Sequence, residues 1–356
     1  MLRLDSIPER SYNLDLLRIL ASILVVILHV AGAHWTTVDV YSPAWKTFCF
    51  YNSTTRSCVP LFFMISGQLF LSKSQISLSQ LYKKNILRLI IIYFFWAALY
   101  AITYRSVTSV LYQGSFAAYF TGIIHAKYHL WFLPALIGVY CIAPLLFSIA
   151  KFENGNYLPY SCLLFFLFSI MRSTLLMIPF RNPDIVTLLK LLPYELIGYS
   201  GYFLLGYYLS KHDYRKLHIW QLVSSLVLVL GVAVAINIEY AENLGRPSGM
   251  LFDWMKLPNY MSSIIIYILF QKLGPKVSGM PSERLRKMIM TIAKCSFTVY
   301  LLHPFILDRL LIWFGISSMS FSPWASIPII AVAVYVVCVF ITLLLNRIPL
   351  VKKWLI

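Results

Sequence analysis

Long apolar runs, broken by short polar stretches, make up most of the chain. A helix needs about 20 mainly apolar residues to cross a bilayer, and most of these runs approach or exceed that length. The polar breaks separate about ten runs, which cover residues 13–33, 57–72, 84–104, 129–150, 157–178, 194–210, 217–238, 257–273, 294–313 and 324–346. The pattern therefore predicts an all-α, polytopic membrane protein with about ten transmembrane helices, formed by a single domain over residues 1–356.

The composition agrees with a chain that faces lipid. Hydrophobic residues account for 60% of it and charged residues for only 12%, with a mean hydropathy of +0.75. Soluble domains carry about 25% charged residues, so a soluble enzyme is excluded. In a soluble protein the net charge of +17 would suggest a nucleic-acid partner. Membrane proteins instead gather Lys and Arg in cytoplasmic loops, so we expect membrane lipid, and no nucleic acid, among the partners.

The positions of Lys and Arg also predict the orientation. If the amino terminus is cytoplasmic, the segments on that side hold roughly twice as many of these residues as the segments on the other side. Both termini are therefore expected in the cytoplasm. We expect the first run to be a retained helix rather than a cleavable signal peptide, because Arg18 interrupts it and a signal core avoids charge.

A polar track runs along the first apolar segment. The sequence NLDLLRILASILVVILHV places Asp15, Arg18 and His29 among aliphatic residues. Eleven residues make about three turns of an α-helix. Arg18 and His29 therefore share one face, about 16 Å apart along the helix axis, and Ser22 falls on the same stripe between them.

Two interpretations of this track remain open. In the first, Asp15 and Arg18 form an ion pair near the membrane surface, and His29 bonds a neighbouring helix. In the second, the track faces a substrate path, as ionisable groups inside membrane helices usually do. A histidine suits a general base at neutral pH, and an arginine suits a phosphate. The alignment of Arg18 with His29 favours the second interpretation, with Asp15 orienting Arg18.

Further candidate residues lie on later segments. Ser296, Tyr300 and His303 are spaced so that they share one helix face. This face is either a cavity wall or a set of hydrogen bonds between helices. His129 and Glu195 each lie at the start of an apolar segment, where they could contact a polar acceptor.

Ser66 and the cysteines point to packing rather than catalysis. Ser66 precedes a glycine, a pair typical of close helix packing, and the GxSxG pattern of a nucleophile is missing. Cys49 and Cys58 lie in the predicted first loop, where the spacing allows a disulfide without establishing one. The sequence has no CxxC or His-rich pattern, so we expect no metal site.

Several stretches together resemble the bacterial acyltransferase 3 family of multi-spanning acyltransferases. The first is LDLLRILASILVVILH, in which ten residues separate the arginine from the histidine. The others are VPLFFMISGQLFL (59–71), YKKNILRL (82–89), HLWFLPALI (129–137), YFLLGYYLS (202–210) and SFTVYLLH (296–303). The resemblance covers nearly the whole chain. Within the family, the chain is most similar to the stand-alone enterobacterial common antigen O-acetyltransferase type.

The resemblance implies catalytic and donor-binding residues. His29 and Arg18 occupy the positions of the family's essential histidine and arginine, which makes them the expected catalytic pair. Family members often carry an Arg-x-x-Arg pair at the start of the third helix, where this chain has Lys84, Asn85 and Arg88. Only Arg88 clearly matches that pair, and Lys84 supplies a charge at a different helix angle. Arg18, Lys84 and Arg88 are expected to bind the phosphates of coenzyme A.

The predicted function is therefore a membrane O-acyltransferase of the bacterial inner membrane. The resemblance implies that it moves an acyl group from cytoplasmic acetyl-CoA, or another short acyl-CoA, to a hydroxyl of a cell-surface polysaccharide or its lipid-linked precursor. Glu195, His129, Tyr300 and His303 are the candidates for binding this acceptor glycan.

The alternative is an exporter or flippase of a polysaccharide or lipid-linked sugar, because a similar scaffold serves some export proteins. An exporter has no evident need for a basic coenzyme A site, and a purely structural protein would leave the polar track unexplained. Arg18, His29 and the basic start of the third segment therefore favour the enzyme.

Overall fold

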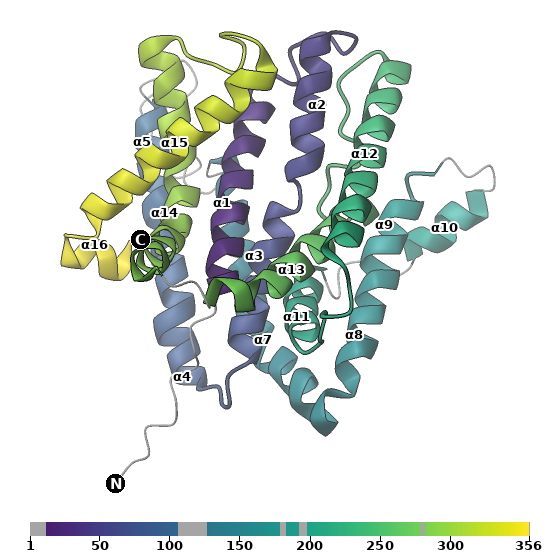
Figure 1. Ribbon diagram of the computed structural model, residues 1–356, viewed down its shortest axis with the longest axis vertical. Helices are drawn as coiled ribbons and strands as arrows, with labels where there is room; N and C mark the ends of the chain where they lie inside the picture. The colour runs from purple at the N-terminus through teal and green to yellow at the C-terminus, as the bar shows by residue number, and fades with distance from the viewer. Residues whose placement is uncertain (1–11, 106–126, 179–182, 192–197, 279–281, 356) are drawn as a thin grey trace.

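The computed structural model describes residues 12–105, 127–178, 183–191, 198–278 and 282–355 (Figure 1). Its elements in chain order are α1 (Tyr12–Gly32), α2 (Pro43–Thr55), α3 (Cys58–Leu71), α4 (Leu78–Gln80), η1 (Leu81–Ile86), α5 (Leu87–Arg105), η2 (Tyr128–Trp131), α7 (Phe132–Lys151), η3 (Phe152–Gly155), α8 (Tyr157–Phe165), η4 (Phe166–Met171), α9 (Arg172–Leu175), α10 (Pro183–Leu191), α11 (Gly198–Ser210), α12 (Ile219–Leu244), α13 (Leu257–Ser278), α14 (Glu283–Phe314), α15 (Pro323–Leu345) and α16 (Pro349–Trp354). Within these described residues there is no strand, so the predicted all-α class is confirmed.

Among the residues that the structure describes, seven helices or runs of consecutive helices are long and apolar enough to cross a membrane. They are Tyr12–Gly32, Leu78–Thr103, Tyr128–Lys151, Tyr157–Leu175, Ile219–Leu244, Glu283–Phe314 and Pro323–Leu345. The predicted segments 57–72, 194–210 and 257–273 overlap α3, α11 and α13, which are not among these seven. A multi-pass helical architecture is therefore supported. The count of about ten spans and the cytoplasmic termini stay predictions.

The predicted first loop contains a helix instead. The Ser42 hydroxyl accepts a hydrogen bond from the Trp45 N–H at 3.1 Å, and Pro43 occupies the first turn of α2. Both residue types are favoured at these positions. Trp45 is fully buried, so packing stabilises a helix too polar to be recognised as an apolar run. Cys49 in α2 and Cys58 in α3 are buried free thiols, not a disulfide.

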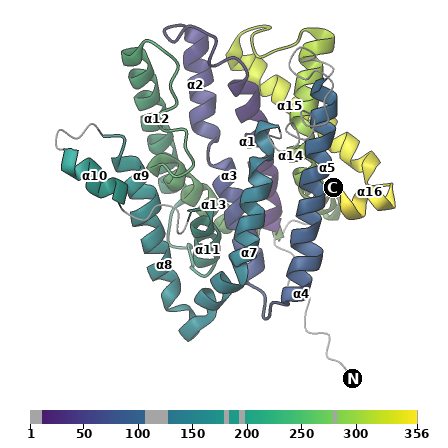
Figure 2. The same ribbon diagram turned by 180° about the vertical axis from the view of Figure 1, so that it is seen from behind.

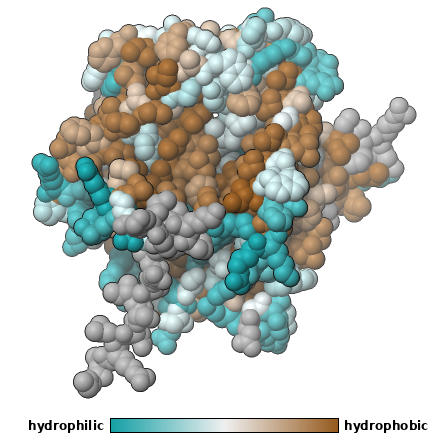
Figure 3. Space-filling model, in the orientation of Figure 1, coloured by the Kyte–Doolittle hydropathy of each residue, from teal (hydrophilic) through white to brown (hydrophobic). Residues whose placement is uncertain are grey.

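The first helix lies inside the bundle. α1 contacts α2, α3, α13, α14 and α15, and it runs through the middle of the molecule in both ribbon views (Figures 1 and 2). In α1, 56% of the apolar window is buried, against 11% in α12, which therefore faces outward. Figure 3 shows hydrophobic residues across the middle of one face and hydrophilic residues toward its ends, as expected for a surface in contact with lipid.

A very close helix crossing joins α3 to α11. A Cβ atom added to Gly67 would overlap the backbone of Phe203, and one added to Gly206 would overlap the backbone of Met64. Only glycine allows two backbones to approach so closely. The crossing agrees with the packing role expected for the Ser66–Gly67 pair. Because α3 also carries residues of the candidate site, the crossing fixes the position of one wall of that site.

Candidate active site

The polar track of α1 faces the interior of the bundle. Arg18 and His29 lie on this one helix, about 16 Å apart along its axis. Between them, the Ser22 hydroxyl is buried, 3.3 Å from Ser296 Oγ and 3.1 Å from the Tyr335 hydroxyl. The track is therefore covered by α14 and α15 rather than by lipid.

Asp15 lies beside Arg18, as the sequence predicted. The Asp15 side chain is only 3% exposed, and its Oδ1 lies 3.5 Å from Nη1 of Arg18, which is 32% exposed. A buried carboxylate at this distance holds the guanidinium by charge rather than by a short hydrogen bond. This ion pair leaves the guanidinium of Arg18 in a position to reach a cavity.

This space, here named the basic cavity, has a volume of about 460 Å³. Four basic residues line it: Arg18 from α1, Lys84 from η1, Arg88 from α5 and Lys294 from α14. The other lining residues are Phe62, Ile65, Ser66, Asn85, Leu89, Ile92, Phe132, Leu136, Tyr140, Ala293, Ser296, Phe297 and Tyr300. A concave wall with several cations and low-dielectric surroundings attracts anions. The three predicted phosphate-binding residues thus meet in one cavity, together with Lys294, which the sequence analysis missed.

A wide helical turn carries Lys84 into the basic cavity. Leu81–Ile86 form the π-helical turn η1, and α5 continues from it toward Arg88. A π turn changes the angular offset between the residues before it and those after it, and such turns are frequent at functional sites. Lys84 and Arg88 line the same cavity, since residues four positions apart share a helix face, although the family's Arg-x-x-Arg spacing is not kept.

His29 belongs to a cluster of aromatic rings at the other end of the track. Its imidazole stacks on that of His303 with 4.9 Å between ring centroids and 6° between ring planes. Tyr128 packs its ring edge-on against His29 at 5.2 Å. Residues from α14 and η2 therefore fix the orientation of the His29 ring. The sequence analysis did not single out Tyr128.

His303 is completely buried behind His29. Its Nδ1 lies 3.1 Å from the carbonyl oxygen of Val299, so Nδ1 is assigned as the donor and Nε2 keeps its lone pair. Nε2 is buried and has no hydrogen-bond partner among the described residues. His303 also lines neither the basic cavity nor the two cavities that adjoin His29. Its placement suits a residue that orients His29 better than the predicted contact with an acceptor.

Tyr300 and His129 connect α14 to η2. The Tyr300 hydroxyl donates to the carbonyl oxygen of His129 at 2.7 Å, which joins α14 to η2. The Tyr100 hydroxyl donates to the carbonyl oxygen of Leu301 at 2.7 Å, which joins α5 to α14. The His129 ring lies edge-on to His303, with 5.5 Å between centroids. The Tyr300 hydroxyl is thus used in helix packing, while its ring lines the basic cavity. Both interpretations given for this helix face, cavity wall and helix bonding, therefore apply.

Two further cavities adjoin His29. The small apolar cavity measures about 30 Å³ and is lined by Val25, Leu28, His29, Val59, Phe62, His129, Trp131, Phe132, Trp254 and Tyr300. The distal cavity measures about 450 Å³ and is lined by His29, Val30, Gly32, Ala33, His34, Tyr128, Leu307, Asp308, Leu311, Ile316, Ser317 and Ser318.

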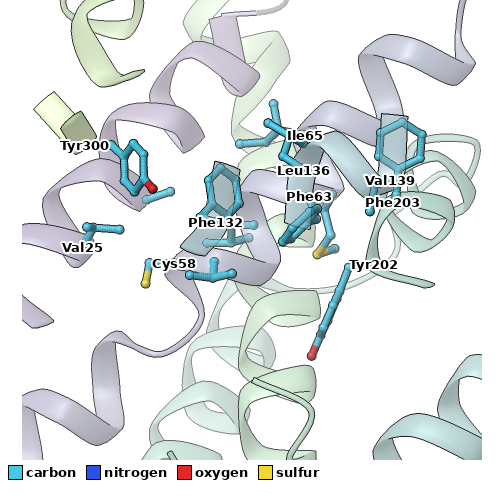
Figure 4. Close-up of a cluster of buried hydrophobic side chains, with 14 of the residues drawn as sticks. Val25, Cys58, Phe63, Ile65, Phe132, Leu136, Val139, Tyr202, Phe203 and Tyr300 are labelled. Atoms are coloured by element: carbon cyan, nitrogen blue, oxygen red, sulfur yellow. The ribbon is translucent and has the colours of Figure 1, made fainter. Parts of the chain in front are cut away.

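The three cavities lie in series along α1. Phe62, Phe132 and Tyr300 line both the basic and the small cavity, and His29 lines both the small and the distal cavity. In Figure 4, Phe132 lies between Val25 and Tyr300 on one side and the aromatic core around Phe63 on the other. His29 therefore lies at the boundary between the small and the distal cavity, and Phe62, Phe132 and Tyr300 lie between the small and the basic cavity.

In the part of the chain that the structure describes, the three clustered histidines are not arranged as metal ligands. Among the residues that the structure describes, no group of three or more His, Cys, Asp or Glu side chains is arranged to hold a metal ion. The geometry gives the reason, because imidazole lone pairs lie in the ring plane. The nearly parallel planes of His29 and His303 therefore cannot direct two lone pairs at one point.

An ion pair borders the distal cavity. Lys127 Nζ lies 3.1 Å from Oδ2 of Asp308, and burial lowers the pKa of Lys127 to about 8. His34 Nδ1 lies 3.0 Å from the Ser318 hydroxyl in the same cavity. These polar groups come from segments far apart in sequence, so the sequence analysis did not group them. Glu195, a predicted acceptor-binding residue, lies outside the described residues.

Comparison with known families shows which family this chain belongs to. A family model described as an acyltransferase domain matches residues 11–343. The chain belongs to this acyltransferase family. Neither the search of curated proteins nor that of solved structures gave a match. The family membership makes the chain a membrane acyltransferase and confirms the resemblance inferred from the sequence.

All candidate residues of this acyltransferase lie inside the matched range, from Arg18 to His303. The match is to the family as a whole, so similarity to the enterobacterial common antigen type stays a prediction. The donor, the acyl group and the acceptor likewise stay predictions.

Proposed function

We propose that this acyltransferase moves an acyl group from acyl-CoA to a hydroxyl of a glycan or lipid-linked glycan, with His29 as the general base. One observation carries the proposal: His29 lies between the distal cavity and a small cavity whose walls include three residues of the basic cavity. This order of spaces suits two substrates that meet at one histidine. We further propose that the enzyme works in the bacterial inner membrane, with the basic cavity open to the cytoplasm.

The basic cavity suits the donor. Coenzyme A carries several phosphates, and cationic side chains bind phosphates by charge-assisted hydrogen bonds. Arg18, Lys84, Arg88 and Lys294 would hold these phosphates, while the neutral and aromatic walls of the cavity would accept the thin pantetheine arm. From Arg18 the arm would extend along α1 toward His29. Phosphate binding at one end of the helix and chemistry at the other would explain their separation.

Chemistry at His29 follows from its two-sided position. An imidazole nitrogen of His29 takes the proton of the acceptor hydroxyl while the hydroxyl oxygen bonds to the thioester carbonyl carbon. The carbon–sulfur bond then breaks, and the acyl group stays on the acceptor oxygen as an ester. The proton passes from His29 to the departing thiolate. Stacking on His303 and the edge of Tyr128 keep the His29 ring oriented throughout. General-base catalysis of this type contributes about 10²- to 10⁴-fold to a rate.

The distal cavity suits the acceptor. His34, Asp308, Ser317 and Ser318 offer hydrogen-bonding groups along a cavity of about 450 Å³. Sugar hydroxyls are recognised by such groups. A glycan acceptor approaching from this side would bring its hydroxyl to His29 and the thioester without displacing the coenzyme from the basic cavity. Family membership favours this transferase over an exporter built on the same scaffold.

The test uses labelled acetyl-CoA supplied to membrane vesicles on the face that carries Arg18. We expect label to enter a glycan fraction with the wild type and His29→Ala to lower this transfer at least about 100-fold. His212→Ala is the matched control, because His212 is exposed and lines none of the three cavities. Equal transfer by the wild type and His29→Ala would overturn the base assignment. Glycan export that depends on the protein without transfer of label would favour the exporter.

A further inference from the structure

The small apolar cavity beside His29 has a composition unlike its neighbours. Among the described residues that line it there is no Asp, Glu, Lys or Arg. Val25, Leu28 and Val59 contribute aliphatic surface, and Phe62 and Phe132 contribute aromatic surface. A space of this kind holds an apolar group and disfavours a charged one.

Its position is next to the point where the proposed reaction occurs. Phe62, Phe132 and Tyr300 separate it from the basic cavity, and His29 forms part of its wall. A thioester at the end of an arm that comes from the basic cavity would reach His29 with its acyl group beside this space. We infer that the small apolar cavity is the acyl pocket of the enzyme and that its size selects acetyl over longer acyl groups. The inference rests on the proposed function.

Volume limits what the pocket can accept. It measures about 30 Å³, against about 460 Å³ for the basic cavity and about 450 Å³ for the distal cavity. Of these three spaces the pocket therefore offers the least room to an acyl chain, which favours a short group such as acetyl. A butyryl chain needs more room than an acetyl group, and a succinyl group would also place a carboxylate beside a wall that has no Lys or Arg among its described residues.

Contacts between aromatic rings support part of the wall. Phe132 packs against Phe63 at 5.0 Å and against Tyr300 at 5.5 Å between ring centroids. Trp131 stacks on Trp254 at 6.0 Å, and Trp254 lies under the guanidinium of Arg56 at 5.1 Å. Aromatic contacts of this kind fix ring positions. A rigid wall discriminates between substrates that differ by a methylene group, which a soft one does not.

Two neighbouring valines on α1 provide a matched test. Val25 and Val26 are both buried, with 4% and 1% of their surface exposed, but only Val25 lines the acyl pocket. Val25 also lies one turn before His29. Val25→Ala enlarges the pocket, whereas Val26→Ala removes the same two methyl groups from the core elsewhere. Leu28→Ala, which enlarges the pocket from a second position, serves if Val25→Ala is poorly folded.

The experiment compares acetyl-, butyryl- and succinyl-CoA as donors in the vesicle assay. We expect the wild type to prefer acetyl-CoA strongly over the other two. Val25→Ala and Leu28→Ala should raise the butyryl-to-acetyl ratio of kcat/KM at least about tenfold, since one methylene group in an apolar pocket changes it by about 10- to 200-fold. Val26→Ala should leave this ratio unchanged, whatever it does to the amount of folded protein.

Each result separates the acyl pocket from the proposed function. Equal use of butyryl- and acetyl-CoA by the wild type would overturn the acyl pocket but not the transferase. So would variants that lower all rates by one factor and leave the ratio unchanged, because the cavity is then only a packing space. Transfer from none of the three thioesters would overturn the proposed function, and the acyl pocket with it.

Discussion

The basic cavity and the small apolar cavity share three side chains but differ in size and in the charge of their walls. The first is large, about 460 Å³, and carries four cations from four different elements. The second, about 30 Å³, is lined without Asp, Glu, Lys or Arg among its described residues. Charge acts over several ångströms and recognises any substrate with phosphates in the right region. Close packing acts only at contact and depends on shape.

This difference favours a separate role in substrate recognition for each of the two cavities. The basic cavity would bind the part that all coenzyme A thioesters have in common, and the small cavity would sense the part in which they differ. Mutations in the two places are therefore expected to give different kinetic signatures. Arg18 and Val25, on the same helix, make the comparison direct.

The largest expected effect disturbs both cavities at once. Gly67→Ala places a Cβ against the backbone of Phe203 and must push α3 away from α11, which moves the Phe62 wall. We expect a loss of stability of about 3 kcal/mol or more, measured as a lower thermal midpoint in detergent. Gly138→Ala in α7 is the control, because a Cβ there meets nothing within 4 Å. Equal midpoints for the two variants would contradict the close crossing.

Removing charge from the basic cavity is expected to weaken the binding of every donor. Arg18→Gln should raise the KM for acyl-CoA about 10- to 150-fold, the equivalent of one charged hydrogen bond worth about 1.5–3 kcal/mol. The preference between acetyl- and butyryl-CoA should not change, in contrast to Val25→Ala. Arg215→Gln, which changes an exposed arginine outside the three cavities, is the matched control. A shift in acyl preference caused by Arg18→Gln would break the division between the two cavities.

A smaller effect is expected at His303. His303→Ala removes the ring that stacks on His29 and should lower kcat about 2- to 12-fold, because an aromatic contact contributes about 0.5–1.5 kcal/mol. His303→Phe keeps a stacked ring and should restore most of kcat, with the pH dependence of kcat retained. If phenylalanine is as poor as alanine, the Nε2 lone pair rather than the stacking is what His303 contributes.

The smallest expected effect concerns the pH dependence of the distal cavity. Burial lowers the pKa of Lys127 to about 8, so the ion pair with Asp308 is lost as the pH rises through 8. The loss should reduce transfer by up to about fivefold, since such pairs contribute about 0.2–1 kcal/mol. Lys127→Arg stays charged and should move this decline to higher pH. A decline at the same pH in both proteins, measured between pH 7 and 10, would assign it to another group.

Stability should change in the opposite direction over this range. The unfolded chain keeps the Lys127 proton up to its ordinary pKa of 10.5, whereas the folded protein releases it near 8. The unfolded state therefore binds more protons between these two values, and the contribution of Lys127 to stability rises with pH. Activity that falls while thermal stability holds would distinguish loss of the ion pair from unfolding.

Helix geometry alone determined the main axis of the site. Eleven residues of α-helix return to the same face, so the order of residues already aligned Arg18 with His29. Length and hydropathy likewise predicted an all-helical membrane protein, because a bilayer requires long apolar helices whatever their neighbours. The resemblance to the family, together with the rarity of functionless charge beside a membrane helix, pointed to the start of α5 as the expected binding region for coenzyme A phosphates.

Tertiary structure decided which side chains meet across helices. The stacking of His303 on His29, the arrival of Lys294 in the basic cavity and the edge contact of Tyr128 all join segments distant in sequence. α2 was missed because its burial depends on partners such as those around Trp45 rather than on its own hydropathy. The acyl pocket is the extreme case. Its volume is the space left between side chains of several helices. That volume depends on how closely these side chains pack, to a fraction of an ångström, and no local pattern in the sequence records such packing.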